Sequence, residues 1–147
     1  MSELPHATVA TVVENEGRYL LVREKINGQV VYNQPAGHIE PGESIVEAAL
    51  RETLEETGWK VELTGFAGIS VYHAANGVSY IRTTLNARPL QHLPELPLDA
   101  GILEAVWLNY TEILDLTQSL RSPIVLKVIE DHRRGVNYPL ELIYEQS

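Results

Sequence analysis

The segment from Ser44 to Gly58 predicts a single helix with a defined beginning and end. Ser44 is a suitable N-cap, and Glu47, three residues later, completes a capping box. Gly58 follows the final helical residues, at the position where a left-handed C-terminal stop is expected. At about 100° per residue, one face carries an apolar stripe that we expect to contact the core, formed by Val46, Leu50 and Leu54.

The opposite face of this helix combines small and apolar residues with three glutamates, Glu52, Glu55 and Glu56. The small and apolar residues indicate a second packed surface; they are Ile45, Ala48 and Ala49. Like charges at i,i+4 repel by roughly 0.2–0.5 kcal/mol, and the C-terminal half of a helix disfavours anions. A divalent cation such as Mg²⁺ would resolve both conflicts, because it takes oxygen ligands from a few carboxylates. Helix chemistry alone leaves two interpretations, a metal site and a solvated acidic surface.

A wider pattern surrounds these glutamates. It consists of Gly37, five residues, Glu43, seven residues, Arg51-Glu52, two residues, Glu55-Glu56, one residue and Gly58. The chain therefore resembles the Nudix hydrolase family at every fixed position of the family's sequence box. It departs from the box at two aliphatic positions, which hold Thr53 and Trp59. Both are packing positions, so the departures concern how the helix fits the sheet and leave the chemistry unchanged.

The resemblance implies an α+β fold, an α/β/α sandwich with a mixed central sheet, that hydrolyses phosphoanhydrides with Mg²⁺ or Mn²⁺. It implies metal binding by three catalytic glutamates and one backbone carbonyl: Glu52, Glu55, Glu56 and Ala36. Arg51, also counted as catalytic, would hold the loop and a ligand carboxylate in place. The loop itself would depend on Gly37, Glu43 and Gly58. These residue types suit an activated anhydride, whose hydrolysis needs mainly positioning and charge neutralisation.

The sequence offers several candidate residues for the general base and for the contacts to the substrate. Asp99 and Glu104 are candidates for the base, and Glu52 itself is a third. Phosphate requires cationic or backbone donors, and the candidate cations are Arg23, Arg82 and Arg121. A ring requires an aromatic face or an amide edge, and the candidates are Asn33, Tyr32, Tyr72 and Tyr80. His38, inside the loop, is a further candidate contact.

Outside the helix, the chain reads mainly as short strands. They are predicted at 7–13, 18–23, 30–33, 61–63, 66–72, 78–87 and 104–108, with turns at 15–17 and 26–29. A loop is expected between 34 and 43, and the proline-rich stretch 88–101 predicts a longer loop, a candidate lid. Thr111 is expected to cap a short helix, and Ser122-Pro123 to open a longer one. This order indicates an α+β architecture rather than a series of βαβ units.

Composition limits the classes of function. With 147 residues, the chain has the size of one domain, and a single Nudix hydrolase domain over 1–147 is expected. There is no Cys, which excludes disulfides, thiolate zinc sites and cysteine nucleophiles. Eleven Lys+Arg and 20 Asp+Glu give a formal charge of −9, which argues against long nucleic acid as a partner. It permits a small anionic ligand, since a metal ion inverts the local charge.

No apolar stretch approaches the roughly 18 residues of a membrane helix, and residues 1–6 lack the features of a signal peptide. We therefore expect a cytoplasmic protein without a membrane partner, and the sequence leaves monomer and dimer open.

Three strings outside the box extend the resemblance to bacterial phosphatases of the Nudix family: 33–38, 120–123 and 138–141. They imply a small phosphorylated substrate, with orthophosphate released from nucleoside tri- and diphosphates and, as a further substrate, hydroxymethylpyrimidine pyrophosphate. The alternative is a non-catalytic Nudix-fold domain that senses a ligand. Such domains usually lose glutamates of the box, whereas this chain retains all of them.

Overall fold

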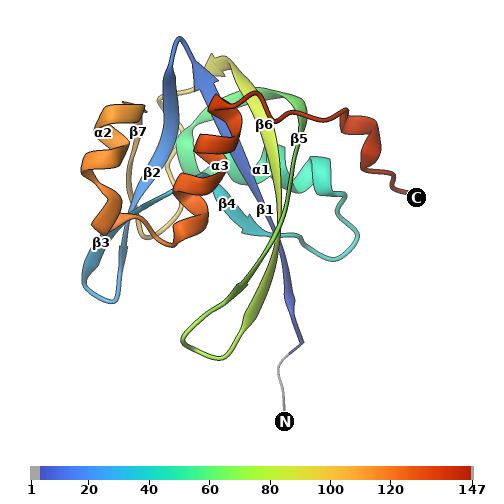
Figure 1. Ribbon diagram of the computed structural model, residues 1–147, viewed down its shortest axis with the longest axis horizontal. Coiled ribbons are helices and arrows are strands. Elements are labelled where there is room, and N and C mark those ends of the chain that lie inside the picture. Colours follow the sequence, from blue (N-terminus) through green and yellow to red (C-terminus); the bar gives the residue numbers. More distant parts are fainter. Residues whose placement is uncertain (1–3, 147) are drawn as a thin grey trace.

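The computed structural model describes residues 4–146, in which a mixed β-sheet lies between helices (Figure 1). The strands are β1 (His6–Asn15), β2 (Arg18–Ile26), β3 (Gln29–Asn33), β4 (Ala36–His38), β5 (Trp59–His73), β6 (Ser79–His92) and β7 (Ile102–Asn109). The helices are α1 (Ile45–Thr57), α2 (Tyr110–Asp115) and α3 (Pro123–Arg133), with 3-10 turns at η1 (Thr117–Ser119) and η2 (Leu140–Leu142). The prediction that residues 1–6 form no signal peptide falls partly on residues 1–3, which lie outside the described residues.

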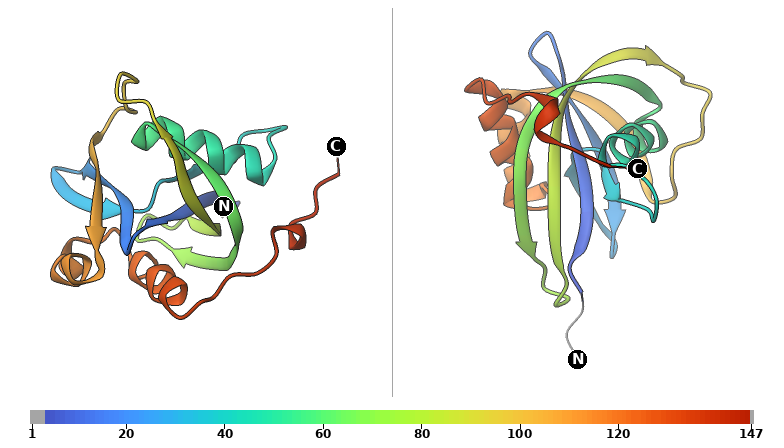
Figure 2. Two further views of the ribbon diagram at one scale, coloured as in Figure 1. Left: turned by 90° about the horizontal axis from the view of Figure 1, so that it is seen from above. Right: turned by 90° about the vertical axis from the view of Figure 1, so that its right-hand side faces the viewer.

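The sheet has the order β3-β2-β1-β6-β5, with β4 paired to β1 and β7 paired to β2. β1 and β6 run parallel, whereas the other pairs are antiparallel. Helix α1 lies on one side of the sheet, and α2 and α3 lie on the other (Figure 2). The α+β class and the α/β/α sandwich with a mixed sheet are therefore confirmed. Between residues 4 and 146, no helix combines the length and apolar character that crossing a membrane requires.

Tight turns join the first three strands. Glu16 and Gly17 adopt φ angles of 51° and 81°, and Asn27 and Gly28 adopt φ angles of 50° and 79°. Positive φ at both central residues matches the right-handed twist of a two-residue hairpin. The two turns predicted between these strands are therefore present.

The hydrophobic core has one part on each side of the sheet. Towards α1 the buried cluster is Val9, Ala48, Ala49 and Leu85. Towards α2 and α3 it is Val12, Tyr19, Leu21, Ile113, Val128 and Ile129. A third cluster is formed by strand residues, namely Val13, Leu20, Val61 and Ala87. Each central strand thus buries both faces, as expected for a sheet covered on both sides.

Helix α1 begins and ends where the sequence predicts. The Ser44 side chain accepts a hydrogen bond from the Glu47 N–H, and the Glu47 carboxylate accepts one from the Ser44 N–H. Gly58 closes the helix with a φ of 76°. The capping box and the glycine stop are confirmed.

The buried face of α1 is the second packed surface predicted with Ala48 and Ala49, and not the stripe expected to contact the core. Its buried residues are Ala48, Ala49, Thr53, Glu56 and Thr57. Leu50, from the stripe expected to contact the core, is 38% exposed, so that prediction was wrong. Small side chains let the helix lie close to the sheet, and Thr53 fits because its hydroxyl donates to the Ala49 carbonyl at 2.7 Å. Its oxygen also lies 2.8 Å from Thr11 Oγ1 on β1. The departure from an aliphatic residue at position 53 is thereby compensated.

Other boundaries differ because strand pairing overrides local signals. β4 occupies part of the expected loop, since it pairs with β1. β5 spans both predicted strands because its pairing with β6 continues through three irregularities. β6 extends to His92 and includes Pro89, which lies opposite Val61 next to a register shift. The first part of the expected proline-rich loop is therefore strand. Asn109, rather than Thr111, caps α2 through a hydrogen bond from Glu112 N.

The chain after α3 returns along β5 and ends beside α1 (Figure 1). Tyr138 and Phe66 exchange two backbone hydrogen bonds, of 2.8 and 2.9 Å. The side-chain oxygen Oδ1 of Asn137 accepts a hydrogen bond from the side-chain Nδ2 of Asn86 at 2.8 Å. A Cβ on Gly65 would lie only 2.0 Å from that same Asn137 oxygen. Gly65 is thus required by the close approach of the C-terminal segment.

We predict that Gly65→Ala destabilises the fold by at least about 1 kcal/mol, because the new methyl group displaces Asn137 from Asn86. In an Asn137→Ala background the same substitution should cost clearly less, since the obstructing side chain is gone. Urea unfolding of the four proteins measures this coupling. Additive effects of the two substitutions would contradict the prediction.

Candidate active site

Three carboxylates meet at the C-terminal half of α1. Glu52 and Glu56 lie one turn apart on the helix, and Asp99 joins them from the loop between β6 and β7. One carboxylate oxygen from each residue lies within 4.8 Å of those of the other two. The Asp99 N–H donates to the Glu55 carbonyl at 3.1 Å, which attaches this loop to the helix.

Glu56 is the most buried of the three carboxylates, with 8% of the residue exposed. Its Oε1 accepts a hydrogen bond from the Ala36 N–H at 2.9 Å, so the helix is joined here to β4. Burial raises the pKa of Glu56 to about 8, and the neighbouring Glu52, Glu24 and Asp99 charges act in the same direction. Burial also raises the pKa of Glu52, against the effect of Arg51. Buried carboxylates this close together are stabilised by binding either a proton or a cation.

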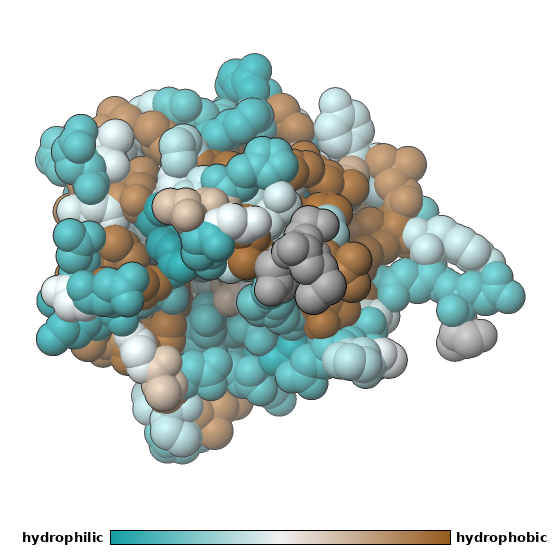
Figure 3. All heavy atoms as spheres, turned by 90° about the horizontal axis from the view of Figure 1, so that it is seen from below, coloured by the Kyte–Doolittle hydropathy of each residue, from teal (hydrophilic) through white to brown (hydrophobic). Residues whose placement is uncertain are grey.

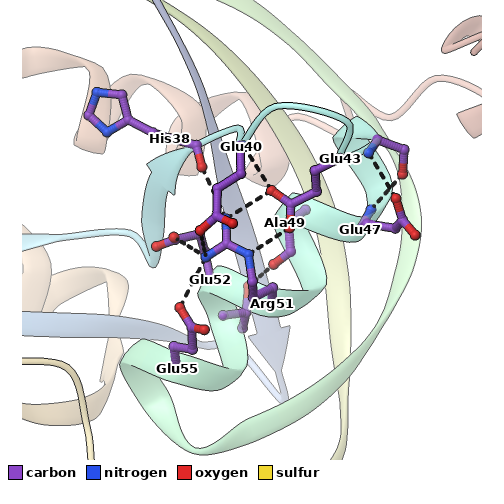
Figure 4. Close-up of polar contacts among 10 residues, drawn as sticks. His38, Glu40, Glu43, Glu47, Ala49, Arg51, Glu52 and Glu55 are labelled. Atoms are coloured by element: carbon purple, nitrogen blue, oxygen red, sulfur yellow. Dashed lines mark hydrogen bonds and ion pairs between the residues drawn. The ribbon is translucent and has the colours of Figure 1, made fainter.

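Arg51 connects the helix to the loop that precedes it (Figure 4). Its guanidinium donates twice to Glu43, at 2.6 and 2.9 Å, and once to the His38 carbonyl at 3.1 Å. It also donates to Glu52 at 2.6 Å and to Glu55 at 3.0 Å. The hydrogen bonds from Arg51 favour the ionised form of the Glu43 carboxyl and lower its pKa to about 2.

Glycine at position 37 is needed for space rather than for a turn. It lies in β4 and does not have a positive φ. A Cβ at this position would lie 2.0 Å from Oε2 of Glu52 and 2.2 Å from its carboxyl carbon. Glycine therefore makes room for the Glu52 carboxylate, which lies directly against the strand.

Glu55 is separated from the carboxylate cluster, although the sequence groups it with Glu52 and Glu56. Its side chain is 43% exposed and its carboxylate contacts Arg51. Asp99, predicted only as a candidate base, takes the third place in the cluster. Its proximity depends on the course of a loop more than 40 residues further along the chain, so helix periodicity could not indicate it.

A cavity of about 520 Å³ adjoins Glu52 and Glu56. It opens at the end of the molecule that carries the β2–β3 and β5–β6 turns, where hydrophilic side chains border a recessed area (Figure 3). Most of the predicted substrate contacts line it, namely Asn33, Tyr72, Tyr80, Arg82, Arg121 and His38, together with Ala36 and Gly37. The volume is within the usual range for small-molecule sites.

Arg82 is the most buried cation of the cavity, with 8% of the residue exposed. It donates to the Gln34 side chain at 2.8 Å, and its Nε has no hydrogen-bond partner in the described part of the chain. Burial lowers the pKa of Arg82 to about 10. A guanidinium that lines the cavity is suited to an anionic ligand.

Three predicted residues lie elsewhere. Arg23 and Glu104, candidates for phosphate binding and for the base, form an ion pair of 2.7 Å with each other and do not line the cavity. They are cross-strand neighbours on β2 and β7, so their charges compensate locally. Tyr32 packs against the core cluster near α2 and α3.

Glu24 lines the cavity but was not recognised in the sequence. It shares a face of β2 with the buried residues Leu20 and Val22. That alternation was the available signal. It was obscured because Arg23, Glu24 and Lys25 together read as the solvated end of a strand.

An α/β/α sandwich that presents this glycine and glutamate box beside a cavity is characteristic of Nudix hydrolases. The model of the NUDIX domain family matches residues 4–127, and the chain belongs to this family. It is 41% identical over 139 residues to the phosphatase NudJ of Escherichia coli K12, covering 95% of this chain and 90% of that protein.

Solved structures agree with this assignment. A NUDIX hydrolase from Nitrosomonas europaea superposes with a TM-score of 0.94 at 41% identity, covering 97% of this chain and 98% of the other. The MutT protein of Methanosarcina mazei shares the fold, with a TM-score of 0.74 at 23% identity over 92% of this chain and 99% of the other. The chain is thus a Nudix hydrolase related to the phosphatase NudJ, and a non-catalytic sensing domain is not supported.

The buried carboxyls should make the metal-free protein less stable as the pH rises. Because the pKa of Glu56 is raised from 4.5 to about 8, the folded state binds more protons than the unfolded chain between these values. We predict that the free energy of unfolding in the presence of a chelator falls from about pH 5 to about pH 8. Urea titrations at several pH values measure the slope, which should be shallower in Glu56→Gln. An equal slope in both proteins would contradict the prediction.

Proposed function

We propose that this chain is a Mg²⁺- or Mn²⁺-dependent phosphoanhydride hydrolase that releases orthophosphate from nucleoside tri- and diphosphates. Its main support is the position of Glu52, Glu56 and Asp99, whose carboxylate oxygens converge within 4.8 Å beside a cavity that contains two arginines. The relative from E. coli is named a phosphatase, which favours orthophosphate as the product. We also propose hydroxymethylpyrimidine pyrophosphate as a substrate and residues 1–147 as one Nudix domain.

The donor set suits a hard divalent cation. Glu52, Glu56 and Asp99 supply oxygen ligands, and the chain has no Cys, so the chemistry favours Mg²⁺ or Mn²⁺ over Zn²⁺. The cation would also compensate the burial and the repulsion that raise the pKa of Glu56. We retain the carbonyl of Ala36 as a proposed ligand because this residue already contacts Glu56. When bound, such ions neutralise phosphoryl charge and lower the pKa of bound water.

The other residues of the box act on the position of these ligands. Arg51 fixes the Glu52 carboxylate and, through Glu43, the loop before α1. Glu55 assists through its contact with Arg51 and through the carbonyl that receives the Asp99 N–H. We propose Asp99 or Glu52 as the general base, since each belongs to the cluster, whereas Glu104 is paired with Arg23 outside the cavity.

The remaining cavity residues would hold the substrate. Arg82 and Arg121 are the cations of its lining and suit the phosphate chain. Tyr72, Tyr80 and Asn33 offer aromatic faces and an amide to a ring.

We predict that Glu56→Gln lowers kcat with Mg²⁺ by at least about a hundredfold, because it removes one charge from the metal ligands. The fold should be retained, since an amide oxygen can still accept from the Ala36 N–H. Steady-state kinetics and far-UV circular dichroism test both parts. Glu130→Gln, an exposed helical glutamate on α3, is the matched control and should keep full activity. Near-normal turnover by Glu56→Gln would contradict the ligand assignment.

The product distinguishes the proposed reaction from other Nudix activities. With GTP and Mg²⁺, we predict release of orthophosphate in excess of pyrophosphate, because attack at the terminal phosphorus leaves the diphosphate on the nucleoside. Separate enzymatic assays for the two anions measure the ratio. Predominant pyrophosphate would contradict orthophosphate release while leaving the hydrolase assignment intact.

A further inference from the structure

Glu24 is a carboxylate in the cavity wall that belongs to neither the metal cluster nor the core. Its side chain is only 14% exposed, yet its single ion pair among the described residues is a long one, 3.5 Å from Glu24 Oε2 to the Arg121 guanidinium. Arg121 is itself 47% exposed. The second oxygen, Oε1, makes no hydrogen bond or ion pair with residues 4–146. A carboxylate in the cavity wall with one oxygen free can accept a hydrogen bond from a bound ligand.

Regular alternation along β2 places Glu24 on this wall. The pairing of β2 with β3 continues without a shift from Val22 to Ile26. The register shift against β7 leaves out Leu103, which belongs to β7, so Glu24 keeps the face that it shares with Leu20 and Val22. Arg23 turns to Glu104, outside the cavity, while Glu24 and Asn33 line it.

The chemistry of Glu24 suits the ring of a substrate rather than its phosphates. An ionised carboxylate only accepts hydrogen bonds, and it repels phosphate oxygens. Arg82 and Arg121, by contrast, present donors to the same cavity. An acceptor at this point of the cavity matches an exocyclic amino group, as in cytosine, adenine or a 4-aminopyrimidine.

We propose that Glu24 is a specificity-determining residue that accepts a hydrogen bond from the exocyclic amino group of the substrate ring. It selects amino rings over the corresponding oxo rings, whose oxygen would face the carboxylate without a donor. This inference rests on the proposed function, because it assumes that a phosphorylated ring occupies the cavity.

The test compares substrates that differ only at this group. For the wild type, kcat/KM with Mg²⁺ should be at least about tenfold higher for CTP than for UTP, and for ATP than for inosine triphosphate. A 4-aminopyrimidine pyrophosphate and its 4-oxo analogue form a third pair, which separates a free pyrimidine from a nucleotide as the source of the ring. At least one pair must show the preference, and Glu24→Gln should reduce it to about threefold or less.

Glu62→Gln is the matched control. Glu62 is also a strand glutamate paired with an arginine, Arg88, but it does not line the cavity. Its substitution should leave every ratio unchanged. Thermal unfolding of both variants verifies that they are folded.

The outcomes separate this inference from the proposed function. Turnover with equal rates for amino and oxo substrates would overturn the role of Glu24 and leave the hydrolase proposal standing. An equal loss for all substrates in Glu24→Gln would make Glu24 only a structural partner of Arg121 and also overturn it. Absence of turnover on every substrate would overturn the proposed function. In that case, calorimetric binding of CMP and UMP tests the role of Glu24. Tighter binding of CMP that is lost in Glu24→Gln supports this role, and any other result overturns it.

Discussion

The site depends on one arginine that neutralises a group of acids from two segments. The side chain of Arg51 is 23% exposed and contacts Glu43, Glu52 and Glu55, with Glu40 at 3.7 Å (Figure 4). Without this cation, the carboxylates of the loop and the helix would repel one another across the gap between β4 and α1. Removing one partner from such a half-buried group leaves the others uncompensated, which costs more than an ordinary surface ion pair contributes. The protein therefore keeps an acidic metal-binding face and a folded loop at the same time.

The same region shows why two positions of α1 hold alanine. Ala48 and Ala49 let α1 approach the sheet, and this approach brings the Glu52 carboxylate against the backbone of Gly37. Glu56 is then close enough to accept the Ala36 N–H. Close packing and the geometry of the carboxylates are thus one feature, since a larger residue on either side would separate the helix from the strand.

Local signals in the sequence were sufficient for the ends of α1, the hairpin turns and the α+β class. Each depends on residues close in sequence, such as Ser44 with Glu47, or on a left-handed glycine. The packed surface through Ala48 and Ala49 was predicted, but the stripe through Leu50 was wrongly expected to contact the core, because hydrophobicity favours leucine whereas close contact with a sheet favours alanine and threonine. Asp99 reaches the site through a loop, and its position does not follow from periodicity. Glu24 follows the alternation of β2, which the neighbouring charges Arg23 and Lys25 obscured.

The catalytic helix is held from both ends by segments remote in sequence. At its C-terminal end, the Leu93 N–H donates to the Gly58 carbonyl at 2.8 Å and the Asp99 N–H to that of Glu55. At its N-terminal end, the Glu145 carboxylate accepts the Ile45 N–H at 2.6 Å. An anion at this end also complements the helix dipole. Glu145 lies beyond residue 127, where the match to the family model ends. The orientation of Glu52 and Glu56 is consequently set in part by a segment that the box does not include.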